Sequence, residues 1–145
     1  MATRLPPISY PALLWEEGYI YLAKTPLELC AHVRSSFAET VQKSKAGGLR
    51  LADSDGHSFE VADWARVRPF GGVAAIGLLL TFSIFAVPIL VNERQPALAE
   101  FKKILARAVI GRYRYDTDKW HALDSLHKLR RADSYRAAID ALPKR

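Results

Sequence analysis

The feature that most constrains this chain is a stretch without charge between Arg68 and Glu93. Its central part, 71–91, is almost wholly apolar. About 20 apolar residues are enough for a helix to cross a bilayer, so the length alone allows a transmembrane helix. A continuous apolar run is also typical of a buried strand region in a protein core. The choice between these two readings decides the fold class.

Composition and flanking charge favour the core reading. The second half of the run is rich in β-branched and aromatic residues, which suit strands, and Pro88 interrupts it. Lys and Arg near the ends of a span favour the cytoplasmic side, and here more of them follow the run than precede it. A span would therefore translocate the residues before it, whose start lacks the apolar core of a signal peptide. We expect a buried strand region, with a single-pass span over 71–91 as the alternative.

Length and composition predict one domain over residues 1–145. Half of the residues are hydrophobic and a quarter are charged, which is ordinary for a globular protein of this size. Cys30 is the only cysteine, so no internal disulfide can form. Without a signal peptide, a reducing compartment and hence a cytoplasmic location are expected, and the membrane alternative would place the chain in the inner membrane.

Two hairpins and one capped helix are predicted before the apolar run. The first hairpin joins 11–15 to 19–23, and the second joins 49–53 to 58–61 through a turn at Asp55-Gly56. Between them, Thr25 can cap a helix that Glu28 supports as a capping box and that ends at Gly47. A third short strand is expected around 65–68, just before the run.

Three helices are predicted after the run. The first begins at Pro96 and ends near Ile110, with Gly111 as its terminator. The second spans 119–131, and Asp133 or Ser134 caps the last. The resulting fold class is α+β, with a mostly antiparallel sheet, an N-terminal capped helix and three C-terminal helices. In such a sheet Pro88 requires an edge position, a bulge or a strand end.

No motif indicates catalysis, a cofactor or a metal site. The segment 53–56 (DSDG) resembles the start of a calcium loop, but EF-hand spacing places apolar residues where carboxylates are required, so a turn is the better interpretation. His121, Asp124 and His127 recur on one helix, from which three ligands rarely converge on a metal. Cys30 lies on an apolar helix face, where cysteine acts as a small hydrophobe. We therefore expect no enzyme activity, no cofactor and no metal.

The net charge of +6 lies entirely in the second part of the chain. Residues 1–91 carry eight basic and eight acidic residues, whereas 92–145 carry thirteen basic and seven acidic ones. Such asymmetry suggests an acidic partner, although a solvated helical surface shows the same pattern. Alternating cations and aromatics at 112–115 would suit phosphates and stacked bases. A small nucleic-acid-binding protein is therefore a further alternative, without any recognised binding motif to support it.

Four segments together resemble a group of known proteins. They are GYIYL at 18–22, LRLADSDGHSFEV at 49–61, LAEFKKIL at 98–105 and the closing LDSLHKLRRADSYRAAIDAL. As an ordered set they are similar to small uncharacterised bacterial α+β proteins of the polymorphic-toxin immunity type. The motifs that carry the resemblance are structural, so it transfers no catalytic residue.

The resemblance implies a non-enzymatic protein-binding module that acts by occluding a partner protein, with an acidic toxin domain as the expected partner. Trp, Tyr and Arg dominate binding hot spots. The residues nominated as partner-binding anchors are Arg112, Tyr113, Arg114, Tyr115 and Trp120.

Overall fold

The computed structural model describes residues 7–16, 19–67, 83–113 and 119–142. Its strands form one curled, antiparallel six-stranded sheet in the order β2-β1-β4-β5-β6-β3. The strands are β1 (Ala12–Glu16), β2 (Tyr19–Ala23), β3 (Ala31–Val33), β4 (Arg50–Ala52), β5 (Ser58–Arg66) and β6 (Ser83–Arg94). The helices are α1 (Pro26–Cys30), α2 (Arg34–Lys45), α4 (Leu98–Tyr113), α5 (Lys119–Arg131) and α6 (Tyr135–Asp140). The predicted α+β class is confirmed.

Both predicted hairpins are present. β1 pairs with β2 from Ala12↔Ala23 to Glu16↔Tyr19. In the β4–β5 turn, the Asp53 carboxylate accepts hydrogen bonds from the backbone N–H groups of Asp55 and His57, at 3.0 and 2.9 Å. Gly56 has φ +87°, the left-handed conformation that this turn requires. Segment 53–56 is therefore the predicted turn, closed by its own aspartate.

The predicted N-terminal helix is divided into two. Thr25 caps α1 as expected, because its hydroxyl accepts a hydrogen bond from the Glu28 N–H at 3.2 Å. Residues Ala31–Val33 then form β3, which pairs with the start of β6, and α2 begins only at Arg34. The prediction of one continuous helix was wrong because pairing with β6, which is distant in sequence, replaces helical hydrogen bonds at these three residues.

The strand expected separately at 65–68 was also wrong, because β5 continues unbroken through Arg66. Its register with β6 shifts between Val61 and Asp63, so the strand bends at a bulge instead of ending.

The second half of the apolar run forms β6, which buries Phe85, Ala86 and Val87. The first half, 71–82, lies outside the described residues. A single membrane helix over 71–91 is excluded, because residues 83–91 belong to a strand. Among the described helices, none has both the length and the hydropathy needed to cross a bilayer. On one side of β6, Pro88 pairs with Trp64 of β5. On the other side, β3 pairs only with the first three residues of β6, so Pro88 has the expected edge position there.

The C-terminal helices follow the prediction, except that α4 begins at Leu98 instead of Pro96 and ends later than expected. α5 has the predicted bounds, and the Ser134 hydroxyl caps α6 by accepting a hydrogen bond from the Ala137 N–H at 3.1 Å. Gly111 does not end α4, which continues to Tyr113. A glycine inside a helix costs only about 1 kcal/mol relative to alanine, and burial of α4 through Phe101, Leu105 and Val109 outweighs that cost.

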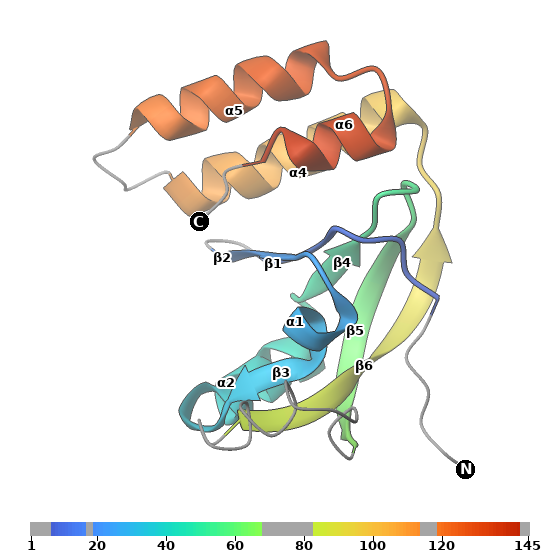
Figure 1. The fold of residues 1–145 in the computed structure, drawn as a ribbon, viewed down its shortest axis with the longest axis vertical. Helices are drawn as coiled ribbons and strands as arrows, with labels where there is room; N and C mark the ends of the chain where they lie inside the picture. The colour runs from blue at the N-terminus through green and yellow to red at the C-terminus, as the bar shows by residue number, and fades with distance from the viewer. Residues whose placement is uncertain (1–6, 17–18, 68–82, 114–118, 143–145) are drawn as a thin grey trace.

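Two hydrophobic cores lie on opposite faces of the sheet. Leu14 points into the first core, with Leu29 and Phe37 of α1 and α2. Its neighbour Leu13 points into the second core, with residues of α4, α5 and α6 such as Phe101. Figure 1 shows α4, α5 and α6 as a layer at one end of the molecule, with α1 and α2 on the other side of β1.

Candidate protein-docking surface

The predicted anchor residues lie at or near the connection between α4 and α5. Arg112 is half-buried near the end of α4, and Tyr113 is the last residue of that helix. Arg114 and Tyr115 lie outside the described residues. Trp120 is the second residue of α5, and its side chain also lies outside the described part. The contacts of these five residues therefore stay a prediction.

A groove that the sequence reading missed lies between α4 and α5. Its volume is about 290 Å³. The lining residues are Ala99, Lys102, Lys103, Ala106, Leu126, Leu129 and Arg130. Alanines on α4 face leucines of α5, so small side chains leave room between two packed helices.

Two large apolar side chains lie on the same helix faces as the groove. Ile110 follows Ala106 by four residues, and Leu123 precedes Leu126 by three, so each lies on the helix face that lines the groove. Ile110 is 48% exposed and Leu123 is 57% exposed. Exposed apolar side chains that cluster on one surface are a common mark of a binding site. The groove and these two side chains together form a surface that we call the α4–α5 surface. Its residues are Ala99, Lys103, Ala106, Ile110, Leu123, Leu126 and Arg130.

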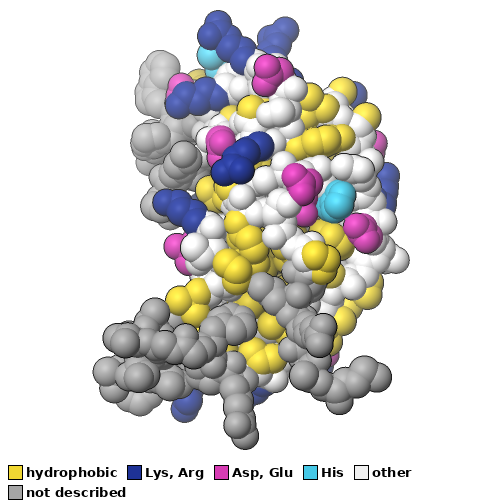
Figure 2. Space-filling model, turned by 45° about the vertical axis from the view of Figure 1, so that its right-hand side comes forward, with side chains coloured by type: hydrophobic (Ala, Val, Ile, Leu, Met, Phe, Trp, Pro, Cys, Tyr) yellow, Lys and Arg dark blue, Asp and Glu magenta, His cyan; other side chains and the backbone are white. Residues whose placement is uncertain are grey.

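The charges on this surface are positive. The Lys102 ammonium donates hydrogen bonds to the carbonyl oxygens of Arg130 and Ala132, both at 2.8 Å, and so satisfies the end of α5. Lys103 and the guanidinium of Arg130 are exposed and have no ion pair within the described residues. Asp124, by contrast, pairs with Lys128 at 3.1 Å. In Figure 2, exposed hydrophobic side chains at the end formed by α4–α6 are surrounded by Lys and Arg side chains with some acidic ones among them.

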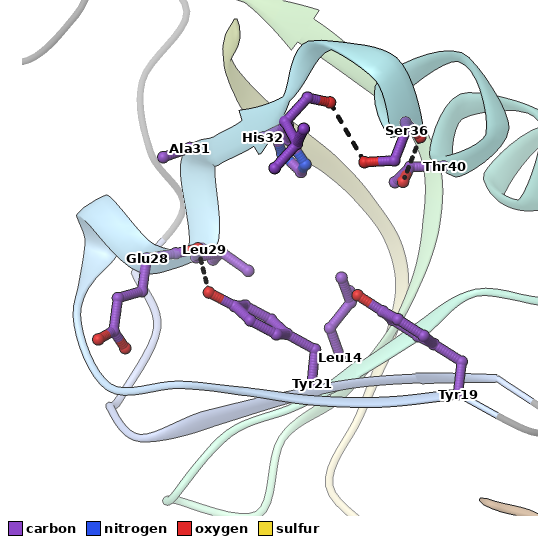
Figure 3. A pocket seen from close by; sticks show the side chains of 10 residues that line it. Leu14, Tyr19, Tyr21, Glu28, Leu29, Ala31, His32, Ser36 and Thr40 are labelled. Atoms are coloured by element: carbon purple, nitrogen blue, oxygen red, sulfur yellow. Dashed lines mark hydrogen bonds between the residues drawn. The ribbon is translucent and has the colours of Figure 1, made fainter. Parts of the chain in front are cut away.

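A second pocket, of about 200 Å³, lies between β2 and the α1–β3–α2 segment (Figure 3). Its lining residues are Leu14, Tyr19, Tyr21, Glu28, Leu29, Ala31, His32, Val33, Ser36 and Thr40. The Tyr21 hydroxyl donates a hydrogen bond to the Glu28 carbonyl at 3.0 Å, which closes one end of the pocket. The Ser36 and Thr40 hydroxyls donate to backbone carbonyls, both at 3.2 Å. The polar groups of α2 at this pocket are thus already bonded.

His32, which lines this pocket, and Cys30, two residues before it, are poor candidates for catalysis. Burial lowers the pKa of His32 to about 4, and a backbone hydrogen bond with Ala86 offsets this only in part. Its ring packs edge-on against Trp64, with ring centroids 4.5 Å apart, and its Nε2 is buried without a partner among the described residues. Burial raises the pKa of the Cys30 thiol to about 12, so little reactive thiolate exists near neutral pH.

The described residues contain no group of three or more His, Cys, Asp and Glu side chains that could hold a metal ion. His127 is exposed on α5, and the side chain of His121 lies outside the described part.

Comparison of the chain with known protein families, curated proteins and solved structures finds no match. The α4–α5 surface is therefore the strongest guide to function. A sequence signal for it exists: beside the core face of Phe101 and Leu105, residues 98–113 carry a second face with Ala99, Ala106 and Ile110, which Lys103 interrupts. The core covers one apolar face of a helix, so apolar residues on a second face stay exposed unless another surface packs against them.

Proposed function

We propose that this protein is a non-enzymatic protein-binding module that docks an acidic amphipathic helix of a partner protein on the α4–α5 surface. The observation that carries the proposal is an apolar groove between two helices, with cations at its rim that have no ion pair among the described residues. It rests on residues that the structure describes and on no similarity to another protein.

The shape of the groove supports a helical occupant. Side chains of a third helix pack well between two antiparallel helices, and Ala99 and Ala106 permit close approach. An amphipathic helix binds such a groove through apolar residues spaced three and four apart, and Ile110 and Leu123 extend the apolar contact. Acidic residues beside that stripe would pair with Lys103 and Arg130 and speed the encounter.

The resemblance to immunity-type proteins adds a partner class to this proposal. The partner would be a bacterial toxin domain with an acidic surface, inhibited in the cytoplasm when its active site is covered. Of the nominated anchors, Arg112 and Tyr113 end α4 and Trp120 lies in the first turn of α5, so the segment that carries them would lengthen the same interface.

The proposal is tested with a synthetic peptide that forms an amphipathic helix with an apolar stripe flanked by glutamates. Binding is followed by fluorescence anisotropy at low and at physiological salt. We expect binding that weakens as salt increases and falls about tenfold in Lys103→Glu, because one favourable charge becomes repulsive. The matched control is Lys45→Glu on α2, an exposed lysine far from the groove, which should leave affinity unchanged.

A scrambled peptide of the same composition separates helical recognition from charge alone. Equal binding of both peptides, or equal affinity in Lys103→Glu, would overturn the proposal. A DNA duplex is added as a competitor. If duplex binds in a Lys103-dependent way and the peptide does not, the surface is a nucleic-acid site and the proposal fails.

A further inference from the structure

The hydrogen bonds of β4 and β5 fix which way each backbone group of the sheet points. The Val61 N–H donates to the Leu49 carbonyl at 3.0 Å, and the Asp53 N–H donates to the His57 carbonyl at 2.9 Å. In an antiparallel pair, hydrogen-bonded residues alternate along the strand. Leu51 therefore bonds to β5, and its two neighbours on β4 direct their backbone groups toward β1.

The same alternation carries across β1 to β2. Arg50 and Ala52 pair with Trp15 and Leu13, so Leu14 bonds to Tyr21 on the other side. Tyr19, Tyr21 and Ala23 thus direct their N–H and C=O groups toward β1. The backbone groups of Ile20 and Leu22 point outward from the edge of the sheet, on the side opposite β1. Within the described residues no hydrogen bond reaches them.

β2 is short, but it lacks the charges, proline and bulge that commonly protect a sheet edge. Native proteins block edge strands with charges, proline or bulges, and the sequence of β2, YIYLA, contains neither a charge nor a proline. The β6 edge beyond β3 differs, because it carries Pro88, Asn92 at φ 55° and a charged end. Of these two edges, β2 is the one suited to accept another strand.

Tyr19 and Tyr21 of β2 project from one face of the sheet, and the pocket beside β2 lies on that face. A strand added at the β2 edge would also present side chains on this face. Figure 3 shows Tyr19 and Tyr21 extending from β2 toward the α1–β3–α2 segment, with the Tyr21 hydroxyl at α1. Both tyrosines are 37% exposed, and Val33 at the pocket is 62% exposed. The volume of about 200 Å³ is far larger than the roughly 30 Å³ of one liquid water, so it has room for a side chain.

We propose that the free edge of β2 binds an extended peptide segment of a partner as an additional strand, with one aliphatic side chain entering the pocket beside Tyr19 and Tyr21. The peptide backbone bonds to the N–H and C=O groups of Ile20 and Leu22. Alternate peptide side chains then face the pocket, which supplies specificity, while the backbone bonds supply affinity. This site is separate from the α4–α5 surface and does not depend on it.

The probe is a displayed library of random peptides, selected on the Lys103→Glu protein so that ligands of the α4–α5 surface are depleted. Selected peptides are synthesised and measured on three proteins: wild type, Ile20→Ala and Ile20→Pro. Both variants lose the half-buried Ile20 side chain, but only the proline also loses the outward N–H. Proline is tolerated at an edge position whose N–H faces away from the sheet.

We expect Ile20→Pro to bind about tenfold more weakly than Ile20→Ala, with similar circular dichroism for both proteins. The second readout uses wild-type protein and peptides N-methylated at one residue at a time. Loss of affinity at every second residue indicates strand pairing and holds even if Ile20→Pro does not fold.

Three outcomes overturn the inference. The first is that no peptide is enriched above a protein-free support. The second is an N-methylation profile without a period of two residues, or equal affinity in folded Ile20→Pro and Ile20→Ala. The third is competition of the selected peptides with the acidic helical peptide, which would place them on the α4–α5 surface and leave the proposed function untouched.

Discussion

The two faces of the sheet are held by different chemistry. The first core, under α1 and α2, contains polar atoms among its apolar side chains: the buried Tyr10 hydroxyl and His32 Nε2 lack partners in the described residues, and the Trp64 Nε1–H donates to the Ser44 hydroxyl at 2.8 Å. The second core, under α4–α6, is centred on aliphatic side chains and Phe101, and its one buried polar atom without a partner among the described residues is the neutral Trp15 Nε1–H. The outer surface of those helices carries exposed cations.

Because of this difference, the two faces should respond to different changes in the solution conditions. A buried neutral imidazole ties the stability of the first face to pH. The second face depends on packing for stability, and its outer surface depends on charge for binding, so salt should change binding there without unfolding the protein. Four predictions test this separation, in order of decreasing effect on stability.

The largest effect is expected for Phe101→Ala in the second core. Phe101 is fully buried, and removing a buried phenylalanine side chain costs about 3–5 kcal/mol through lost burial and a new cavity. The free energy of unfolding is measured by urea denaturation. A loss below about 1 kcal/mol would show that α4 does not hold the second face as described.

The next effect is a pH dependence that comes from His32. The pKa is about 4 in the folded chain and about 6.5 when unfolded, so below pH 6.5 the unfolded state binds a proton that the folded state does not. The free energy of unfolding should therefore fall by up to about 3 kcal/mol as the pH drops from 6.5 to 4. Below pH 4, His32 should cause no further loss. Urea melts of wild type and His32→Leu across this range check it. Parallel profiles for the two proteins would contradict the assignment.

A smaller loss is expected for Ser44→Ala. It leaves the buried Trp64 Nε1–H without an acceptor, which costs about 1–3 kcal/mol. Ser36→Ala on the same helix is the control, because the Ser36 hydroxyl bonds at an exposed position. If both variants unfold at the same urea concentration, the Trp64–Ser44 hydrogen bond contributes nothing to the first core.

The smallest effect on stability is expected for the double variant Ile110→Ser and Leu123→Ser. Both side chains are about half exposed, so each change should alter the unfolding free energy by about 0.5 kcal/mol or less. Binding of the acidic helical peptide should nevertheless fall at least tenfold, or about 1.4 kcal/mol. Unchanged binding would show that Ile110 and Leu123 take no part in binding the peptide.

Local signals in the sequence predicted most of the fold. Turn glycines, the Thr25 and Ser134 caps and alternating apolar residues identified both hairpins and the starts of α1 and α6. The failures came from distant contacts. β3 exists because β6 pairs with it, and Gly111 stays helical because α4 is packed along its length. Neither cause is visible in a local window of sequence.

The candidate site was harder to predict than the fold. The anchors at 112–115 and Trp120 were chosen from residue types, and the structure leaves them untested. The α4–α5 surface depends on which faces two helices leave uncovered, and helical spacing alone does not say which apolar face the core takes. The free edge of β2 depends on strand order, which required the pairing of β1 with β4.

Tyr135 links the two parts of the chain at Gly56. A Cβ added to Gly56 would lie 2.4 Å from the Tyr135 ring, which also packs edge-on against Phe101 and donates its hydroxyl proton to the Pro96 carbonyl at 2.7 Å. A ribosome makes the β4–β5 turn long before it makes α6. The turn therefore acquires this neighbour only after α6 has been made, and until then the hairpin must persist with one side of its glycine exposed to water.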